Sequence, residues 1–327
     1  MIKNFIVITS INAPTRAVKK FAALLDYKTI VVGDKKTPAG WAYKNVGYLS
    51  LQNQIASYAA FCKLLPVNHY SRKMIGYLFA INSGATMIVD TDDDNIPLSN
   101  FAVPNFDGTY DCVYSNMPLN IYSLFINQST NNLIWPRGYP LELITAKNKI
   151  TSSKNIVRVG IWQGLANGDP DVDAIYRMTN GSIDIAFKKR SPVVLKNKTW
   201  CPFNSQNTYF RHECFPLLYL PSTVTFRFTD ILRGIIAQPI LWKFGYSLGF
   251  TQATVFQARN KHTLLKDFID EVPMYLHAKD LISLVGDEVK KSSSCNDALM
   301  RCYSTLHKLS IVKKEELALL KAWLRFF

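Results

Sequence analysis

Four carboxylates stand within five positions in the segment Asp90-Thr91-Asp92-Asp93-Asp94, directly after an apolar run. Like charges this close repel one another, so the cluster is costly unless a cation neutralises it. Hard divalent ions prefer carboxylate oxygens and complete their shell with phosphates and water. We therefore expect Asp92 and Asp94 to bind Mg²⁺ or Mn²⁺, with Asp90 as the competing ligand if the loop bends differently.

The acidic cluster also has two plainer interpretations. A calcium-binding EF loop has similar acidic spacing, but it needs Gly at its sixth position and Glu at its twelfth, where this sequence has Asn95 and Phe101. The EF loop is therefore disfavoured. A solvated acidic loop without a ligand is the alternative that the local sequence leaves open.

The elements that must position this cluster begin with a β-α-β pattern. Residues 5–9 and 29–32 are continuous apolar runs, and residues 15–25 between them carry apolar positions at helical spacing. Strands that are apolar throughout are buried on both faces, which is typical of parallel sheets covered by helices. We therefore expect an α/β fold with a mixed, largely parallel sheet flanked by helices, in which ligands bind beyond the carboxyl ends of the strands.

The rest of the chain supplies further elements. We expect helices at 51–64 and 71–82, strands at 85–90 and 222–228, and a helix that Thr229 or Asp230 caps and that reaches about Lys243. Residues 280–327 read as helices with a break at 292–296. This pattern predicts a catalytic domain of residues 1–279 and a C-terminal helical extension of residues 280–327.

Composition bounds the classes of partner. The 327 residues are 48% apolar and 19% charged, which suits one large domain or two modest ones. The net charge of +14 favours anionic partners such as phosphates, nucleic acid or an anionic membrane surface. We interpret the densest basic stretch, residues 188–198, as a solvated loop, and we therefore expect no nucleic acid partner.

Signals for membrane insertion, export or known cofactor loops are missing from the sequence. No apolar run approaches the roughly 20 residues that cross a bilayer, and residues 1–11 lack a signal-peptide cleavage site. The six cysteines contain no CxxC pair, and the GxGxxG, GxxxxGK[ST] and HExxH motifs are absent. We therefore expect a soluble, cytoplasmic protein. A peripheral contact with an anionic membrane and a homo-oligomer both stay open.

Six motifs, in order along the chain, resemble the GT-A-type domain of the STELLO proteins. They are KMIGYLFAI (73–81), VDTDDDN (89–95), WPRGYPL (135–141), GLANGDPDVDA (164–174), FRFTDILR (226–233) and QARNKH (257–262). The resemblance spans about residues 5–280. It implies a GT-A (Rossmann-like) fold, a nucleotide-diphosphate-sugar donor and a divalent cation, Mn²⁺ or Mg²⁺.

The same motifs resemble, more distantly, the reversibly glycosylated polypeptides, which are UDP-arabinopyranose mutases. In that family an Arg-Gly-Tyr-Pro segment carries an arginine that becomes glycosylated, and this arginine falls on Arg137 here. The family's Asp-Asp-Asp motif falls on Asp92, Asp93 and Asp94. The resemblance leaves open whether the chain is a transferase or a mutase.

Several residues are candidates for catalysis and metal binding. GT-A enzymes often add a distant histidine to the metal, and His262 is the candidate here. Asp230 is expected at a strand-to-helix corner, where it is either a helix N-cap, a general base or a hydrogen-bond acceptor for the donor sugar. Arg233 could pair with Asp230, reach a phosphate or form a plain surface salt bridge. Arg137, in a stiff loop, could hold a diphosphate bidentately or contact the sugar.

Other polar residues are candidates for binding the donor. Their types and positions favour contacts with the nucleotide for Thr9, Asn12, Asp34, Arg72, Lys73 and Asp90, and contacts with sugar hydroxyls for Asp93, Asp171 and Asp173. A turn-forming role is the alternative for Asp34, Asp171 and Asp173. Solvated surface positions are the alternative for Arg72 and Lys73.

The leading hypothesis is a metal-dependent glycosyltransferase that moves a sugar from a nucleotide-diphosphate donor to an unknown glycan, lipid or protein acceptor. The alternative is a nucleotide-sugar mutase, which needs no acceptor and releases no nucleoside diphosphate. A non-catalytic nucleotide-sugar-binding protein is the third hypothesis. The C-terminal helices could dock an acceptor, a membrane surface or another subunit.

Overall fold

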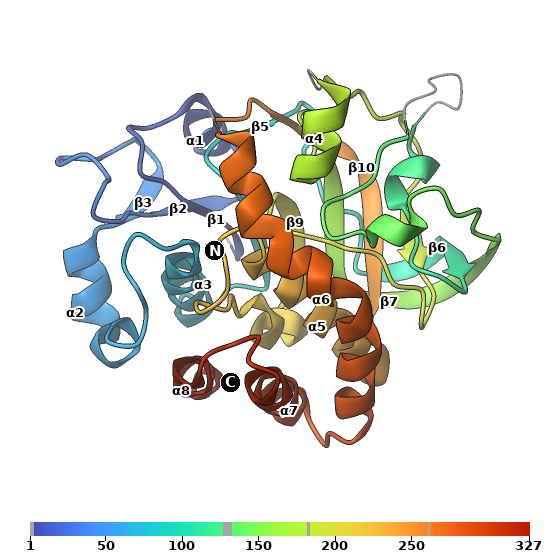
Figure 1. Cartoon of the computed structure of the whole chain (residues 1–327). Helices are drawn as coiled ribbons and strands as arrows, with labels where there is room; N and C mark the ends of the chain where they lie inside the picture. The colour runs from blue at the N-terminus through green and yellow to red at the C-terminus, as the bar shows by residue number, and fades with distance from the viewer. Residues whose placement is uncertain (1–2, 127–132, 182–183, 261) are drawn as a thin grey trace.

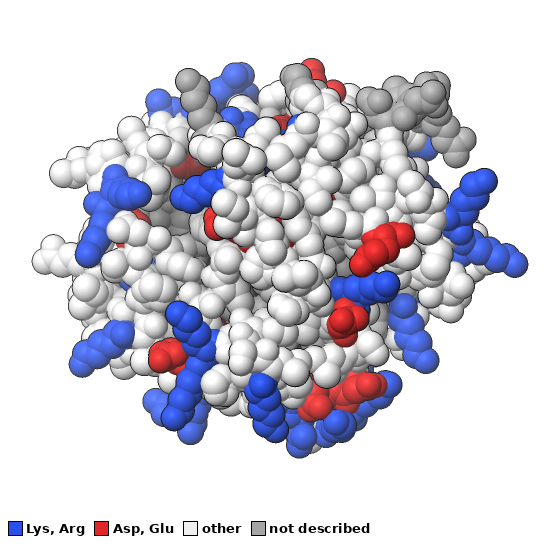
Figure 2. Space-filling model, in the orientation of Figure 1, with Lys and Arg blue, Asp and Glu red and all other residues white. Residues whose placement is uncertain are grey.

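The computed structural model describes residues 3–126, 133–181, 184–260 and 262–327. A large sheet runs through the molecule, and one long helix, α6 (Leu264–Lys290), crosses in front of it towards the C-terminal helices (Figure 1). Lys and Arg side chains lie mainly around the rim of the face in Figure 2, and the centre of that face is largely uncharged. Lys261, in the last sequence motif, and the first two residues lie outside the described residues.

The N-terminal part of the chain forms the β-α-β unit that the apolar runs predict. The parallel strands β1 (Asn4–Thr9) and β2 (Lys28–Val32) are connected by α1 (Arg16–Phe21). Parallel pairing continues outward to β3 (Val46–Leu49) and inward to β4 (Met87–Thr91). Successive residues of β1 are buried, because both faces of this part of the sheet are covered.

Within the described residues the sheet has ten strands in the order β3-β2-β1-β4-β9-β7-β6-β8-β10-β5. The strands beyond β4 are β9 (Asn207–Arg211), β7 (Ile150–Gly168), β6 (Asp107–Ser115), β8 (Val193–Leu195), β10 (Ser247–Gln257) and β5 (Asn95–Pro97). β9 pairs antiparallel with both β4 and β7, and β7 pairs parallel with β10. The mixed α/β fold expected from the sequence is confirmed, and its parallel half carries the acidic cluster.

Helices cover the sheet. The remaining α-helices are α2 (Leu51–Cys62), α3 (Lys73–Asn82), α4 (Ala174–Asn180), α5 (Thr229–Lys243), α7 (Cys295–Lys308) and α8 (Lys314–Leu324). Short 3₁₀ helices form at Tyr70–Arg72, Ile121–Leu124, Leu141–Leu143 and His212–Leu218. The helices predicted at 51–64 and 71–82 and the strand predicted at 85–90 are thus confirmed as α2, α3 and β4. No helix of the described residues is both long and apolar enough to cross a bilayer.

The C-terminal helices pack onto the rest of the molecule. The predicted break is confirmed between α6 and α7, where Ser294 caps α7 by accepting a hydrogen bond from the amide of Asp297. The indole Nε1 of Trp323 in α8 donates to the carbonyl of Pro216, 3.0 Å away. The proposed boundary at residues 279 and 280 falls inside the continuous helix α6.

The strand predicted at residues 222–228 is wrong. The segment is irregular, because its polar groups are satisfied by other partners than a neighbouring strand. The Glu316 carboxylate of α8 accepts hydrogen bonds from the amides of Ser222 and Thr223, and the carbonyl of Thr225 accepts from the amides of Phe228 and Thr229. The alternating pattern of the sequence therefore reflects a turn that ends in α5.

The predicted side-chain cap of α5 is also wrong. Phe228 occupies the N-cap position, and no side chain caps the helix there. The hydroxyl of Thr229 donates to the carbonyl of Thr225 instead, and the Asp230 carboxylate is bound by Arg137. The sequence context of Asp230 is typical of a helix cap, but its carboxylate pairs with the buried guanidinium of Arg137 instead.

Three charged side chains meet beneath the carboxyl end of β4. Asp90 lies between Lys73 of α3, with Nζ 2.8 Å from Oδ1, and Arg233 of α5, with Nη1 2.7 Å from Oδ2. All three side chains are almost completely buried. Burial favours the neutral acid, but the Lys73 ammonium and the Arg233 guanidinium outweigh it and hold the pKa of Asp90 below its ordinary value.

The substitution Asp90→Asn should destabilise the protein by about 3–5 kcal/mol, because it leaves two buried cations without their shared anion. Urea unfolding at pH 7 measures this loss. The exposed Asp26, changed to Asn, serves as the control and should change the free energy of unfolding by less than about 0.5 kcal/mol. Equal stabilities of the two variants would contradict the structural role of Asp90.

Candidate functional site

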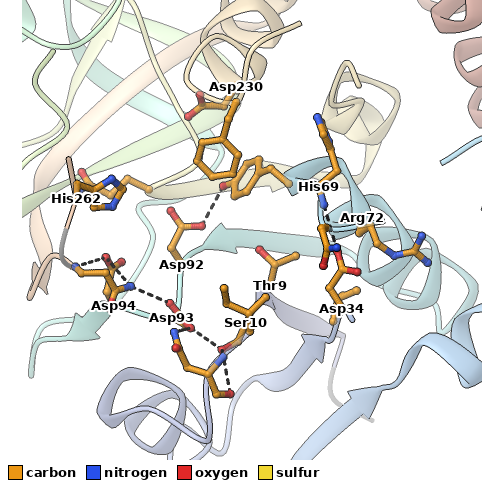
Figure 3. A pocket seen from close by; sticks show the side chains of 18 of the residues that line it. Thr9, Ser10, Asp34, His69, Arg72, Asp92, Asp93, Asp94, Asp230 and His262 are labelled. Atoms are coloured by element: carbon orange, nitrogen blue, oxygen red, sulfur yellow. Dashed lines mark hydrogen bonds between the residues drawn. The ribbon is translucent and has the colours of Figure 1, made fainter. Parts of the chain in front are cut away.

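A cavity of about 480 Å³ opens at the carboxyl ends of β1, β2 and β4. Ligands of open α/β sheets bind at this edge. Eleven of the residues singled out in the sequence line it: Thr9, Asn12, Asp34, Arg72, Asp92, Asp93, Asp94, Arg137, Asp171, Asp230 and His262. Figure 3 shows the carboxylates of Asp92, Asp93, Asp94 and Asp230 around one space, with Thr9 and Asp34 on the side of β1 and β2. The fold thus brings together segments that are far apart in the sequence.

The three aspartates after β4 take different partners. Asp92 accepts hydrogen bonds from the hydroxyl of Tyr70 at 2.9 Å and from Lys73 Nζ at 2.8 Å. Asp93 accepts from the side chains of Ser10 and Asn12, at the end of β1. Asp93 is thus held to the end of β1, although all three carboxylates border the cavity.

Asp94 is less completely bonded. Its Oδ2 atom accepts from Nε2 of Gln257 at 3.2 Å and, at longer distances, from the amide and the side chain of Asn260, whereas its Oδ1 atom is buried and has no hydrogen-bond partner among the described residues. A buried oxygen without a partner is unusual in a folded protein. Burial raises the pKa of Asp94, and the neighbouring Asp93 adds to the rise.

Asp92 also resists ionisation. Burial raises the pKa of Asp92 to about 7; the Lys73 ammonium opposes the rise, while Asp94 and Asp90 add to it. Without another cation the cluster therefore holds more negative charge than its surroundings neutralise. This is the electrostatic condition under which a carboxylate cluster binds a hard cation.

A pH experiment tests this electrostatic strain. Because the folded protein raises the pKa of Asp92 from 3.8 to about 7, the folded state binds this proton more tightly than the unfolded chain. Ionisation of Asp92 therefore costs stability as the pH rises from about 4 to 7. The variant Asp92→Asn lacks this proton, so in EDTA its melting temperature should rise relative to wild type between pH 4 and pH 8. A difference that is constant with pH would contradict the raised pKa.

His262 lies on the cavity wall beside Asp94 (Figure 3). Its Nδ1 atom lies 3.2 Å from Oδ1 of Asp267, and Asp267 also pairs with Arg259 at 2.8 Å. Burial raises the pKa of Asp267, but His262, Arg227 and Arg259 outweigh it and lower the value to about 2. A carboxylate on Nδ1 is the arrangement that orients a histidine whose Nε2 binds a metal.

The side chains of the protein do not by themselves form a complete metal site. Among the described residues, no group of three or more His, Cys, Asp or Glu side chains gathers closely enough to hold an ion. Magnesium sites commonly use only one or two carboxylates and take the remaining oxygens from phosphates and water. The unpartnered Oδ1 of Asp94 fits such a site, in which a ligand must complete the coordination.

A second group of charges lies across the cavity. Nε of Arg137 donates to Asp171 at 2.8 Å, and Nη2 contacts Asp230 at 2.9 Å. Nη1 donates to the carbonyl of Arg227. All three guanidinium nitrogens are therefore bound within the protein, so Arg137 orients Asp171 and Asp230 and has no free edge for bidentate binding of a phosphate.

The loop that carries Arg137 needs its glycine. Gly138 has a φ of 88°, which favours glycine, and a Cβ atom there would come within 2.6 Å of the Ile231 side chain in α5. The tight packing brings Arg137 to the first turn of α5 and hence to Asp230. The sequence interpretation of a stiff, close-approach loop is consistent with this geometry.

Four predicted site residues lie behind the cavity wall. Lys73, Asp90 and Arg233 form the buried ion cluster beneath β4, so Arg233 pairs with Asp90 and not with Asp230. Asp173 caps α4 by accepting from the amide of Tyr176 at 2.8 Å. Burial raises the pKa of Asp173 to about 6. The expected direct contacts of these four side chains with a ligand do not fit their positions.

Two residues on the wall are turned towards the protein. Nε of Arg72 donates to Oε1 of Gln54 at 2.9 Å, and Arg72 is buried. The alternative of solvated positions for Arg72 and Lys73 is therefore wrong as well. Asp34 accepts from the amides of Lys35 and His69, which matches its turn-forming alternative while its carboxylate still borders the cavity.

The structure adds residues that sequence reasoning missed. Tyr70 and Phe226 line the cavity, and their rings meet edge to face with centroids 5.4 Å apart. Phe226 is 51% exposed, although most of its neighbours on the wall are polar. Phe226 is the first residue of the FRFTDILR motif, but the strand predicted at residues 222–228 gave no reason to expect an exposed ring in the cavity. His69, for which no motif indicated a function, also borders the cavity.

One further short pattern carries no chemistry in this fold. Residues 245–249 read Gly-Tyr-Ser-Leu-Gly, which matches the GxSxG pattern of serine hydrolases. That chemistry requires the serine on a sharp turn from a strand into a helix. Ser247 instead begins strand β10 and pairs with Val159. The geometry excludes a nucleophile elbow at this position.

The chain has relatives of known family. A family model described as STELLO glycosyltransferases matches residues 227–326, which include α5 and the C-terminal helices that the sequence motifs left outside the resemblance. The protein named "Probable glycosyltransferase STELLO2" from Arabidopsis thaliana is 28% identical over 96% of this chain, and "Probable glycosyltransferase STELLO1" is 27% identical over the same share. The chain spans 42% of the length of these relatives. The chain is therefore similar to STELLO proteins along nearly its whole sequence, and its mixed α/β fold with an acidic cluster after β4 is compatible with that similarity.

Proposed function

We propose that the chain is a metal-dependent glycosyltransferase that moves a sugar from a nucleotide-diphosphate-sugar donor to an acceptor hydroxyl. The observation that carries this proposal is the cavity itself, in which an under-neutralised carboxylate cluster faces the Arg137–Asp171–Asp230 network. The names of the two relatives, both probable glycosyltransferases, support the reaction class.

The donor would lie with its nucleotide towards β1 and β2. Thr9, Asn12 and Asp34 border this end of the cavity, and their hydroxyl, amide and carboxylate groups can hydrogen-bond a ribose or a base. The diphosphate would then reach the Asp92–Asp94 segment. The sugar would extend towards Asp171 and Asp230 on the far wall.

Asp92, Asp94 and Nε2 of His262 are the groups that would contact Mn²⁺ or Mg²⁺, and because no three such side chains of the described residues gather closely enough to hold an ion by themselves, the ion would bind together with the donor. The ion would neutralise the diphosphate and stabilise the negative charge on the leaving nucleotide. This role explains why the protein keeps two carboxylates whose pKa values are raised by burial. The donor phosphates would supply the oxygens that the protein does not.

The protein's own side chains would direct the transfer. A bond forms between the acceptor oxygen and the anomeric carbon, the bond from that carbon to the phosphate oxygen breaks, and the nucleoside diphosphate leaves with the electron pair. Asp230, held by Arg137 and by the amide of Ser205 at 3.1 Å, would accept the hydroxyl hydrogen as a base or orient it as a hydrogen-bond acceptor. Asp171 would orient a neighbouring hydroxyl.

Calorimetric binding of UDP, GDP, UDP-glucose, UDP-galactose and GDP-mannose tests the donor site. We expect one nucleotide to bind in Mn²⁺ and to lose at least about tenfold in affinity in EDTA, which corresponds to about 1.4 kcal/mol. The variant Asp94→Asn, which keeps the shape of the side chain but not its charge, should show the same loss in Mn²⁺. Asp26→Asn is the surface control and should bind like wild type.

Binding that is unaffected by EDTA and by Asp94→Asn would reject the metal site. If no nucleotide or nucleotide sugar binds, the donor site itself is rejected. Product analysis then separates the reaction classes. Release of a nucleoside diphosphate supports a transferase, whereas a new nucleotide sugar without release would contradict it and indicate a mutase.

A further inference from the structure

Residues 221–228 are here called the Phe226 loop. The loop lies in the sequence between the 3₁₀ helix at His212–Leu218 and α5, and it forms part of the cavity wall. It presents the ring of Phe226 beside Tyr70, whose hydroxyl donates to Asp92. An aromatic ring that is half exposed in a cavity gains free energy when a ligand covers it. Phe226 is therefore placed to pack against a ring of a bound molecule.

Among the described residues, no strand pairs with the Phe226 loop. Its first half is bound by the carboxylate of Glu316, which reaches it from α8 and is completely buried. Glu316 accepts hydrogen bonds from the amide of Ser222 at 2.9 Å, from the amide of Thr223 at 2.8 Å and from the hydroxyl of Thr223 at 2.7 Å. The hydroxyl of Tyr219 donates to the same carboxylate.

The second half of the loop is bound from α6. Nε of Arg227 donates to Oε1 of Glu271 at 2.9 Å, and the hydroxyl of Thr225 donates to the carbonyl of Asp270. The carbonyl of Arg227 accepts from Arg137, which holds the loop to the charge network of the cavity. Phe226 thus stands between two fixed ends, one on α8 and one on α6.

The donors that bind Glu316 are neutral amides and hydroxyls. A buried carboxylate is costly, and hydrogen bonds offset the cost only when several donors converge on it with good geometry. Here the convergence sets the backbone of residues 222 and 223, three residues before the ring. An apolar side chain at this place in α8 would fill the same volume but would leave these amides unbound.

We propose that Glu316 is a positioning residue for the cavity, which fixes the Phe226 loop so that Phe226 packs against the sugar or base ring of a nucleotide sugar. The proposal rests on the proposed function. It gives the C-terminal helices an indirect part in ligand binding, because Glu316 lies behind the cavity wall and acts through the Phe226 loop.

The variant Glu316→Gln tests the proposal in the chain of 327 residues. It keeps the size of the side chain but presents an amide nitrogen to groups that donate hydrogen bonds. We expect hydrogen exchange to accelerate at the amides of Ser222 and Thr223 and onward to Arg227. We also expect the affinity for the nucleotide sugar identified by calorimetry to fall about tenfold, which is within the range for stacking on an aromatic ring.

A double-mutant cycle separates positioning from general stability. If Glu316 acts through Phe226, the variants Glu316→Gln and Phe226→Ala each weaken binding, and the double variant binds no more weakly than Phe226→Ala alone. Thr223→Val removes the hydrogen bond from the Thr223 hydroxyl to Glu316 and the one that this hydroxyl accepts from the amide of Lys313, but it keeps the Glu316 side chain. It should show a smaller effect in the same direction and is available if Glu316→Gln folds poorly.

Lys243→Met is the matched control. Lys243 Nζ donates to the carbonyls of Val289 and Lys290 at the far end of α6, so its loss should lower the melting temperature without changing exchange in the Phe226 loop or the affinity. Additive losses in the cycle, or unchanged binding and exchange in Glu316→Gln, overturn the positioning role. If wild type binds no nucleotide sugar, the proposed function fails and the positioning role falls with it.

Discussion

The buried ion cluster of Lys73, Asp90 and Arg233 is the constraint on which the cavity depends. It joins α3, β4 and α5, because the carboxylate of Asp90 in β4 pairs with one cation from each of the two helices. Such a cluster tolerates little movement, because separating its members would leave Arg233 or Asp90 with an incompletely compensated buried charge. Lys73 also contacts Asp92, and the cluster therefore sets where the acidic segment enters the cavity.

The parallel part of the fold could be predicted from the sequence because its signals are local. The apolar runs at residues 5–9, 29–32 and 85–90 are buried on both faces, and they become β1, β2 and β4. The position of the acidic segment at the end of β4 follows from the same pattern. Eleven of the candidate residues consequently line one cavity.

What the sequence could not show is which carboxylate points into the cavity and which is turned inward. Asp90 and Asp92 are two positions apart, and both contact Lys73, yet Asp90 is completely buried and Asp92 borders the cavity. The strand predicted at residues 222–228 is wrong for a related reason. The loop is held by Glu316, which lies about 90 residues further along the chain. Long-range hydrogen bonds of this kind leave no local pattern.

The length of α6 limits how the chain can be divided. The helix has 27 residues, which corresponds to about 40 Å at 1.5 Å per residue. Its first turns contact His262 and Arg227 at the cavity, and its last turn accepts hydrogen bonds from Lys243 and leads into α7 (Figure 1). A chain cut at residue 279 would end in the middle of α6. It would also lose Glu316 of α8, which binds the Phe226 loop. Recombination between relatives is therefore expected to preserve the segment from Arg227 to the end of α8 as one inherited block, which is nearly the extent of the family match at residues 227–326.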